Sequence, residues 1–404
     1  MSRDATNPGR VRIAYALDNL QTGGTELNAV RTAERLDRNR FDVRVLCLQP
    51  NGPLRARLDA AGIPVSDIGI PGFLTVSAIR RGLEIKRFVK REGIHVVHAH
   101  DPYGNVLAAP WARLAGGVAV IASHRWWRDV HPPKVRVANR ISYRFAHRVL
   151  TNSQSIGELV MREEDVPADR VVVIPNFVDP PAFEPLTAAR RAELRARVGL
   201  APTDVAVGMI ANLNPVKDHA MLLRAAARVL AVLPDTRFVL VGEGRERQAL
   251  TEQAKAAGIA DRVLIPGRLP HEPGMPGMFD VSILTSREEG FPNFVVESMA
   301  ACRAVVATAV GGVTDAVTDG ENGLLVRSGD DEAAANALLR VLKDPAFREQ
   351  LAAAGARYAR QHFHADVVLL ALESLYLDLS RRYAGRHDRD RVDLVSPPRP
   401  RSDS

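Results

Sequence analysis

The sequence has little cysteine and lacks any long apolar run. Only two of its 404 residues are cysteines, Cys47 and Cys302, and they lie far apart in apolar segments. Two such residues provide neither a disulfide framework nor a cluster of metal-binding thiols, which is typical of a protein in a reducing cytoplasm. No apolar run approaches the roughly 18–20 residues that cross a bilayer. Residues 1–10 are polar, so no secretory signal is expected.

Motifs of several enzyme classes are missing as well. The dinucleotide-binding pattern G-x-G-x-x-G has its nearest match at residues 242–247, where Arg247 replaces the third glycine. That replacement counts against a nicotinamide-dependent oxidoreductase. No Ser-His-Asp order or nucleophile elbow stands out either. The Asp-x-Asp segment at residues 388–390 lies in a charged, proline-rich tail, so we expect neither a metal nor another cofactor.

What is present is the composition of a soluble globular protein, with 46% apolar and 25% charged residues. The length fits two domains of roughly 150–200 residues each. The formal net charge of +7 has two interpretations. It reflects either a general excess of arginine or attraction to an anionic partner, such as a membrane surface, a phosphorylated substrate or nucleic acid. The positions of the basic residues decide between them.

Short β-rich runs alternate with longer helical patterns, and this rhythm is interrupted once, by a proline-rich stretch with a charged helix. Such alternation predicts parallel sheets covered on both faces. The predicted fold class is therefore α/β, with two Rossmann-like domains whose sheets face a central cleft, where ligands bind beyond the carboxyl ends of the strands. The predicted order is a disordered N-terminus (1–10), a first Rossmann-like domain (11–180), a linker (181–202), a second Rossmann-like domain (203–360), a C-terminal helix (361–384) that packs back on the first domain, and a disordered tail (385–404).

The segment Glu289-Gly-Phe-Pro-Asn-Phe-Val-Val-Glu297 is the clearest functional signal. A predicted strand ends just before it and a helix follows, so that Glu289 lies in the loop and Glu297 about one turn into the helix. Gly290 frees the backbone, and Pro292 fixes φ before the helix. Free N–H groups at a helix start bind anions. Two carboxylates beside such a start suit a nucleotide-sugar, which has hydroxyls at both ends and charge in the middle. A surface loop with two solvated glutamates is the alternative.

This segment resembles the E-x7-E motif of the family-four retaining glycosyltransferases, which have the GT-B fold and are also called glycosyl transferases group 1. Other segments fit that family in the same order along the chain. Gly23-Gly-Thr-Glu26 resembles its glycine-rich loop. The ordered set is more specific than any one member, and the resemblance covers roughly residues 11–380. The remaining matches are Asn152-Ser-Gln-Ser155, residues 174–179, residues 212–217, Gly242-Glu-Gly244, Gly311-Gly312 and residues 319–323.

The resemblance implies roles for the donor-binding residues. Glu297 would accept hydrogen bonds from the ribose hydroxyls, and Glu289 would face the transferred sugar as a catalytic residue. A carboxylate suits both tasks because it accepts two hydroxyls at once in charge-assisted bonds. The sugar and the diphosphate would meet the backbone of Gly290, Phe291, Pro292, Asn293 and Phe294.

Lys217 is the expected clamp for the diphosphate, because a fixed cation stabilises the charge that a leaving diphosphate gains. A solvated loop lysine is the alternative. The family often has an arginine five residues earlier, where this chain has the uncharged Asn212. A second cation would then come from elsewhere, and Arg268 and Arg245 are the candidates. Asn212, Lys217 and Arg268 are therefore assigned to donor binding.

Two further features of the first domain point to the cleft. Gly23 and Gly24 would let the backbone approach the donor diphosphate or the acceptor closely, unless they form an ordinary turn. His124 follows a predicted strand and resembles the family's active-site histidine, which lies near the sugar, so it is assigned a catalytic role. His100 follows another strand end and is a second candidate. A structural role for either histidine is the alternative.

Basic and aromatic residues gather after His124. Arg125, Trp126, Trp127 and Arg128 are assigned to the acceptor or to a membrane, since tryptophan and arginine together suit sugar stacking or an interface with anionic headgroups. The basic residues between positions 80 and 91 add further charge, and a solvated helix face is the alternative there. The hypothesis is a lipid-linked or otherwise anionic acceptor presented at the cytoplasmic face of the membrane.

The predicted function is transfer of a hexosyl-type sugar, with retention, from a nucleoside-diphosphate sugar to a glycan or lipid-linked acceptor in the synthesis of a cell-surface polysaccharide or glycolipid. By the resemblance, the leaving phosphate takes the proton of the acceptor and no covalent nucleophile is needed. The expected location is the cytoplasm, including the inner face of the cell membrane, and no nucleic-acid partner is expected. A sugar-nucleotide epimerase of the same fold and a catalytically silent nucleotide-sugar-binding protein are the alternatives.

Overall fold

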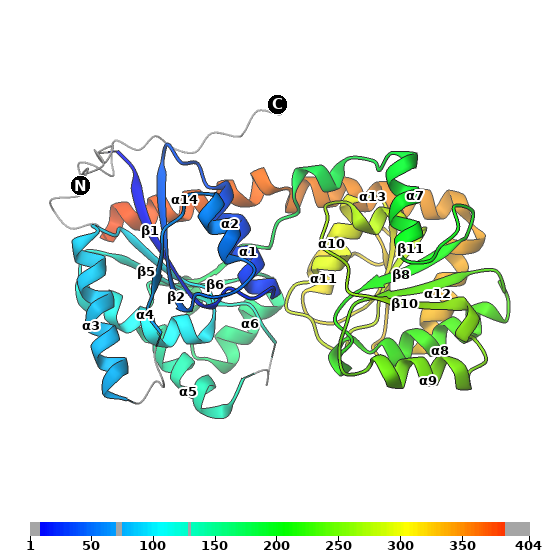
Figure 1. Ribbon diagram of the computed structural model, residues 1–404, viewed down its shortest axis with the longest axis horizontal. Coiled ribbons are helices and arrows are strands. Elements are labelled where there is room, and N and C mark those ends of the chain that lie inside the picture. Colours follow the sequence, from blue (N-terminus) through cyan, green and yellow to red (C-terminus); the bar gives the residue numbers. More distant parts are fainter. Residues whose placement is uncertain (1–8, 70–74, 128–130, 384–404) are drawn as a thin grey trace. The chain divides into compact units, whose positions relative to one another are not determined.

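The computed structural model describes residues 9–69, 75–127 and 131–383. The chain forms two compact units (Figure 1). The first holds the chain up to Pro175 together with the part from Asp366 onward, and the second comprises Asn176–Ala365. Each unit is built on one parallel sheet. The predicted fold of two Rossmann-like domains is therefore confirmed, while the predicted disordered ends, residues 1–10 and 385–404, fall almost wholly outside the described residues.

A seven-stranded sheet forms the centre of the first unit, in the order β3-β2-β1-β4-β5-β6-β7. Every neighbouring pair is parallel, and the central strands are buried on both faces. The strand order reverses between β1 and β4, so a ligand site is expected at the carboxyl ends of the strands there. The strands are β1 (Val11–Asn19), β2 (Phe41–Gln49), β3 (Val65–Asp67), β4 (Val96–Ala99), β5 (Ala119–His124), β6 (Arg148–Thr151) and β7 (Val171–Val173).

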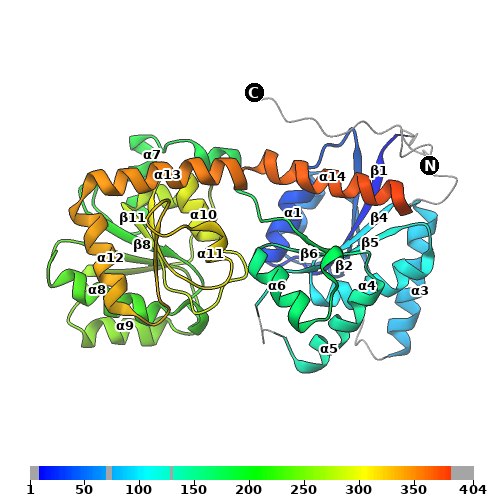
Figure 2. The ribbon, with the colours of Figure 1, turned by 180° about the vertical axis from the view of Figure 1, so that it is seen from behind.

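Helices cover both faces of this sheet. α3, α4, α5 and α6 lie on one face, and α1 and α14 lie on the other (Figures 1 and 2). Tyr376 of α14 donates to the hydroxyl oxygen of Tyr15 at 2.9 Å, and its own oxygen lies 2.7 Å from Nδ1 of His98. The predicted return of the C-terminal helix to the first domain is thereby confirmed. The helices are α1 (Gly24–Arg35), α2 (Arg55–Ala60), α3 (Val76–Arg91), α4 (Pro102–Ala115), α5 (Pro133–Ser142), α6 (Gln154–Glu163) and α14 (Ala365–Tyr383).

The second unit repeats this plan with a six-stranded parallel sheet in the order β10-β9-β8-β11-β12-β13. α8, α9 and α12 lie on one face, and α10 and α13 pack together on the other (Figure 2). Its strand order reverses between β8 and β11. The strands are β8 (Ala206–Ile210), β9 (Arg237–Val241), β10 (Val263–Gly267), β11 (Val281–Leu284), β12 (Ala304–Thr308) and β13 (Leu324–Val326), and the helices are α7 (Ala188–Arg197), α8 (His219–Leu230), α9 (Arg247–Ala256), α10 (Asn293–Ala300), α11 (Val313–Ala316), α12 (Asp331–Lys343) and α13 (Pro345–Phe363).

The stretch predicted as a linker, residues 181–202, belongs to the second unit instead. It contains α7, whose Leu194 lies in the apolar core of that unit. Arg195 is 1% exposed, and its guanidinium donates to the carbonyl oxygens of Ala201 at 3.0 Å and Met278 at 2.9 Å. These bonds compensate the burial of the charge, so a segment that looks too charged for a core becomes part of one.

Candidate functional site

The carboxyl edge between β8 and β11 brings together the predicted donor residues of the second unit. Lys217 ends a 3₁₀ turn (Pro215–Lys217) that follows β8, and Glu289 lies in the loop that joins β11 to α10. The two side chains form an ion pair. Glu289 is 7% exposed and also accepts a hydrogen bond from Ser286 Oγ at 2.7 Å. A carboxylate this buried requires such partners, and here one of them is the predicted diphosphate clamp.

Further hydrogen bonds hold the loop of Lys217 and the loop of Glu289 against each other. The hydroxyl of Thr285 lies 3.1 Å from the carbonyl oxygen of Lys217 and 3.0 Å from that of Asp218. Arg287 Nε donates to Asp218 at 2.9 Å, and the Arg287 amide donates to the carbonyl oxygen of Val216 at 2.7 Å. Asp218 has a φ of +43°, a left-handed conformation that aspartate tolerates, and its side chain caps α8. Hydrogen bonds from residues 285–287 therefore hold the turn that places Lys217 next to Glu289.

Glu297 and the start of α10 lie beyond this pair. α10 begins at Asn293 after Pro292, and Asn293 accepts a hydrogen bond from Asn176 Nδ2 at 3.0 Å. Phe291 and Phe294 are buried in the core of the second unit, so only their backbone is available to a ligand. Glu297, with 23% of its side chain exposed, lies 3.2 Å from His271 Nε2. His271 is a neighbour that the sequence did not indicate, since it stands 26 positions earlier.

Arg268, one of the two residues predicted to supply a second cation, lies close to Asn212. Arg268 Nη2 lies 3.5 Å from the amide oxygen of Asn212, and both residues are on loops at the strand ends. The glycine loop after β9 packs on the same region, because a Cβ at Gly244 would lie 2.1 Å from the carbonyl oxygen of Leu213. Of the two candidate cations, Arg268 is thus the one found beside Asn212.

His219 is a polar group of this edge that the sequence did not indicate. It opens α8 next to Lys217, is 2% exposed, and neither ring nitrogen has a hydrogen-bond partner. Burial, reinforced by the Lys217 charge, lowers its pKa to about 4. It is consequently neutral near pH 7 and adds no charge to the site.

In the first unit the structure brings His124 together with the predicted tryptophans. His124 is 3% exposed, Nδ1 lies 2.8 Å from the hydroxyl of Tyr143, and the ring stacks on Trp126 at 4.3 Å between centroids. Burial lowers the pKa of His124 to about 3, so the imidazole is neutral. Gly23 and Gly24 are placed at the start of α1, after the carboxyl end of β1.

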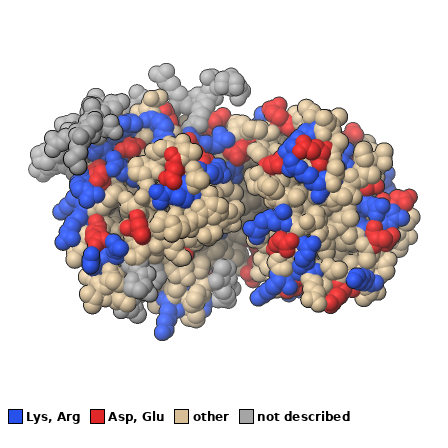
Figure 3. Space-filling view, viewed as in Figure 1, with Lys and Arg blue, Asp and Glu red and all other residues tan. Residues whose placement is uncertain are grey.

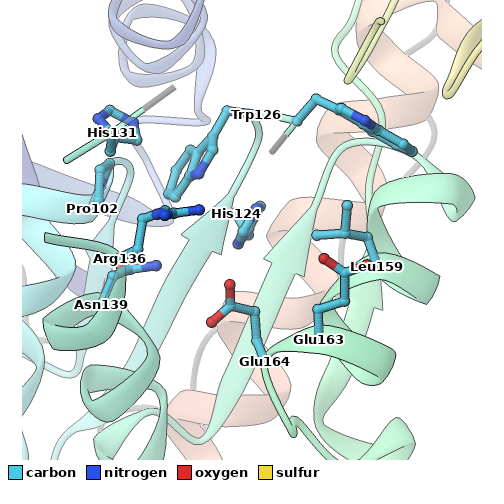
Figure 4. A pocket seen from close by; sticks show the side chains of 10 residues that line it. Pro102, His124, Trp126, His131, Arg136, Asn139, Leu159, Glu163 and Glu164 are labelled. Atoms are coloured by element: carbon cyan, nitrogen blue, oxygen red, sulfur yellow. The ribbon is translucent and has the colours of Figure 1, made fainter. Parts of the chain in front are cut away.

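His124, Trp126 and Trp127 line a cavity of about 320 Å³. Figure 4 shows the carboxylates of Glu163 and Glu164, at the end of α6, directed into it below His124 and Trp126. Burial raises the pKa of Glu164. Neither glutamate was indicated by the sequence, where they look like ordinary residues of a helix end. The lining that matters for a ligand is His124, Trp126, Trp127, Arg136, Glu163 and Glu164.

One described residue assigned to the acceptor or a membrane, Arg125, is not among the residues that line this cavity. The Nε atom of Arg125 is buried, burial lowers the pKa of this residue to about 10, and the groups that act on its charge are Tyr376 and Tyr15 of the network under α14. Arg125 therefore belongs to that internal network, which corrects the prediction. Arg128 lies outside the described residues. His100, the second candidate histidine, is 1% exposed and packs against Tyr15 at 4.3 Å, away from the cavity.

Known proteins share this architecture. The Glycosyl transferases group 1 family matches residues 190–358, and Glycosyltransferase Family 4 matches residues 22–181. The crystal structure of HepE from Anabaena in complex with UDP-glucose has a TM-score of 0.77 and 23% identity, and the match covers 91% of this chain and 100% of that one. That likeness identifies the fold as GT-B.

Two curated relatives indicate the activity as well as the fold, because both are named as glycosyltransferases. An alpha-D-kanosaminyltransferase of Streptomyces kanamyceticus is 31% identical over 323 residues, which are 74% of this chain and 83% of that protein. The UDP-Gal:alpha-D-GlcNAc-diphosphoundecaprenol alpha-1,3-galactosyltransferase of Escherichia coli is 24% identical over 351 residues, 83% of this chain and 89% of that protein. The chain belongs to the family-four, or group 1, glycosyltransferases and is a glycosyltransferase that uses sugar nucleotides.

Proposed function

We propose that this glycosyltransferase moves a hexosyl-type sugar, with retention of anomeric configuration, from a nucleoside-diphosphate sugar to a glycan or lipid-linked acceptor. The pairing of Glu289 with Lys217 beside the start of α10 carries the proposal. The cation proposed for the diphosphate, Lys217, and the carboxylate proposed for the sugar, Glu289, are thereby in direct contact with each other. Glu297 lies on the helix that follows, α10. A ligand that satisfies all three is charged in the middle and hydroxylated at both ends.

Charge develops on both the leaving group and the sugar during the transfer step. As the bond from the sugar to the diphosphate breaks, negative charge grows on the leaving oxygen and positive charge on the sugar ring. Lys217 and the α10 amides favour the first, and Glu289 favours the second. Arg268 beside Asn212 supplies the second cation. We propose on these grounds that the reaction needs neither a metal nor a cofactor.

The acceptor is assigned to the cavity of the first unit. Trp126 and Trp127 offer ring faces for a sugar, and the neutral His124 offers a ring nitrogen to a hydroxyl. The name of the Escherichia coli relative includes an acceptor joined to a lipid diphosphate, which supports a lipid-linked acceptor and a place in the synthesis of a cell-surface polysaccharide or glycolipid. No helix among the described residues is long and apolar enough to cross a membrane. We propose that the enzyme works on the cytoplasmic side.

The test is a thermal-shift screen of the full chain against nucleoside-diphosphate sugars, with EDTA present. The stabilising donor is then incubated with candidate glycan and lipid-diphosphate acceptors, and NMR determines the anomeric configuration of the product. We expect stabilisation by one class of donor, release of nucleoside diphosphate only with acceptor, and an α product from an α donor. The absence of stabilisation by every donor would remove the central claim. An epimerised sugar with no acceptor product would favour the epimerase.

Replacing Glu297 with alanine should weaken binding of the nucleoside diphosphate by about 10- to 100-fold, because the ribose hydroxyls lose charge-assisted hydrogen bonds. The matched control is Glu288→Ala, which removes an exposed carboxylate from the loop of Glu289. Isothermal titration measures both. Equal affinities in the two variants would show that Glu297 does not hold the ribose.

A further inference from the structure

Large apolar side chains are exposed along one stripe of α3. Val76 is 84% exposed, Ile79 56% and Leu83 39%. Their spacing of three and four residues places them on the same side of the helix. The opposite side of α3 is buried through Ile85 and Val89. This helix therefore has an apolar inner face and a partly apolar outer one, which a fully solvated helix does not need.

Two neighbouring helices share this property. On α5, Val137 is 61% exposed and Ile141 48%, again four residues apart. On α4, Leu114 is 58% exposed. α4 contacts both α3 and α5 and lies between them, so the three form one layer over the sheet (Figures 1 and 2). The exposed apolar side chains thus come from a single helical layer of the first unit.

The seam between α3 and α4 fixes the layer. A Cβ at Gly82 of α3 would lie 1.9 Å from Cε2 of Trp111 on α4, so the indole ring rests directly on the α3 backbone. α3 begins with a capped turn, because Thr75 Oγ1 accepts from the Ala78 amide at 3.3 Å. The apolar stripe is consequently presented on a rigid, well-packed helix.

Basic side chains surround the apolar ones. α3 carries six basic residues and one acidic residue, Glu84, which pairs with Arg80 and Arg81. The segment of α5 and the following turn, residues 133–145, carries four basic residues and no acidic one. Lys and Arg line the edge of the unit where α3 lies (Figure 3). The basic residues are Arg80, Arg81, Lys86, Arg87, Lys90 and Arg91 on α3, with Lys134, Arg136, Arg140 and Arg144 on the other segment. Arg136 also lines the cavity of His124, and Arg140 pairs with Asp165, so the excess of positive charge is largest on α3.

We propose that the outer faces of α3 and α5 form a docking surface for an anionic lipid bilayer. The aliphatic side chains Val76, Ile79, Leu83, Val137 and Ile141 enter the headgroup region, and the basic residues around them contact lipid phosphates. The one-sided charge favours an anionic surface over a second copy of this chain, because two such basic faces repel each other. The surface excludes Trp126 and Trp127, which are half-buried in the cavity with His124. It stands independently of the proposed sugar transfer.

The test is co-sedimentation of the full chain with vesicles of phosphatidylcholine alone or of phosphatidylcholine with 30% phosphatidylglycerol. We expect at least tenfold stronger binding to the anionic vesicles and a loss of that preference as salt is raised. The variant Val76→Ser/Ile79→Ser/Leu83→Ser, which leaves every charge in place, should bind at least tenfold more weakly than the wild type. The variant Arg87→Gln/Lys90→Gln should lose most of the preference for anionic lipid.

Matched controls come from the second unit. Val205→Ser/Val232→Ser removes side chains that are 44% and 46% exposed, and Lys255→Gln/Lys343→Gln removes two exposed charges. Both should bind vesicles as the wild type does, and all variants should keep the thermal shift given by a nucleoside-diphosphate sugar. Undiminished binding by the triple serine variant, or no preference of the wild type for anionic vesicles, would overturn the proposal. So would sedimentation velocity that shows a wild-type dimer separated by the serine substitutions.

Discussion

Replacing Lys217 with methionine should lower kcat/KM for sugar transfer by about 10²- to 10³-fold, the loss seen when a fixed group that stabilises developing negative charge is removed. Methionine keeps most of the length of the side chain, so packing changes little. The substitution also leaves the carboxylate of Glu289, 7% exposed, without its cation. A buried carboxylate without its partner costs about 1–3 kcal/mol of folding free energy. Initial rates measure the loss of kcat/KM, and urea titration measures the loss of stability.

Glu289→Gln is the informative partner of that variant. Glutamine still accepts from Ser286 but carries no charge, so Lys217 is released for the diphosphate. We expect transfer to slow by about 100-fold while the nucleoside diphosphate binds as tightly as before or more tightly, because repulsion between anions is removed. Lys217→Met should weaken that binding. Parallel losses of nucleotide affinity in both variants would contradict the division of roles.

The double variant Lys217→Met/Glu289→Gln separates folding from chemistry. Because neither side chain is charged, the stability lost in Lys217→Met should return, while transfer should stay at or below the level of the slower single variant. Recovery of activity together with stability would mean that the pair only supports the fold.

The two-domain α/β fold could be predicted because its strands and helices are recognised from short stretches of sequence, in which apolar runs alternate with helical patterns. The donor segment was also local, since Glu289 and Glu297 bracket one loop and one helix start. The contact between Lys217 and Glu289 spans 72 positions. It depends on β8 and β11 lying side by side, and the reversal of strand order that makes them neighbours has no sequence mark.

The two predictions that were wrong concern arginine side chains that are buried in the structure. The segment that contains α7 was predicted to be a linker because prolines and a charged helix interrupt the α/β pattern there, yet Arg195 is buried and donates to carbonyl groups that the sequence cannot indicate. Arg125 was assigned to the acceptor or a membrane because it stands beside two tryptophans and other basic residues. It is internal because α14, which comes some 250 residues later, brings Tyr376 close to it. Burial of an arginine depends on distant partners, so composition alone misplaces it.

Acidification from pH 7 to pH 5 should weaken the first unit. Burial lowers the pKa of five of its described histidines below the ordinary value, to about 3 for His124 and about 4 for His147, and in the same direction for His98, His100 and His131. The unfolded chain binds protons at these sites near pH 6.5, and the folded chain does not until much lower pH. The stabilisation is therefore complete above about pH 6.5 and is lost as pH falls, by about 2 kcal/mol each for His124 and His147 between pH 7 and pH 5.

Three carboxyl groups of the described first unit, Asp101, Glu26 and Glu164, act in the opposite direction because burial raises their pKa. Burial raises the pKa of Asp101, which accepts from the Gly104 and Asp18 amides, to about 7. Its folded form takes up a proton that the unfolded form does not, which returns about 2 kcal/mol over the same interval. His98, His100 and His131 act in the same direction as His124 and His147, so a net loss of stability is expected. Urea titration at both pH values measures it, with hydrogen exchange of peptides that cover β4 and β5 used to assign the loss to this unit.

His100→Leu isolates one of these contributions. Neither ring nitrogen of His100 has a hydrogen-bond partner among the described residues, and leucine is of similar size, so stability at pH 7 should hold or rise. The loss between pH 7 and pH 5 should shrink, since one proton-binding site of the unfolded chain is gone. His98→Leu is the contrast, because it removes bonds to Tyr376 and Ser123 and should cost stability at both pH values. An unchanged pH dependence in His100→Leu would show that His100 binds its proton equally well in the folded and the unfolded chain.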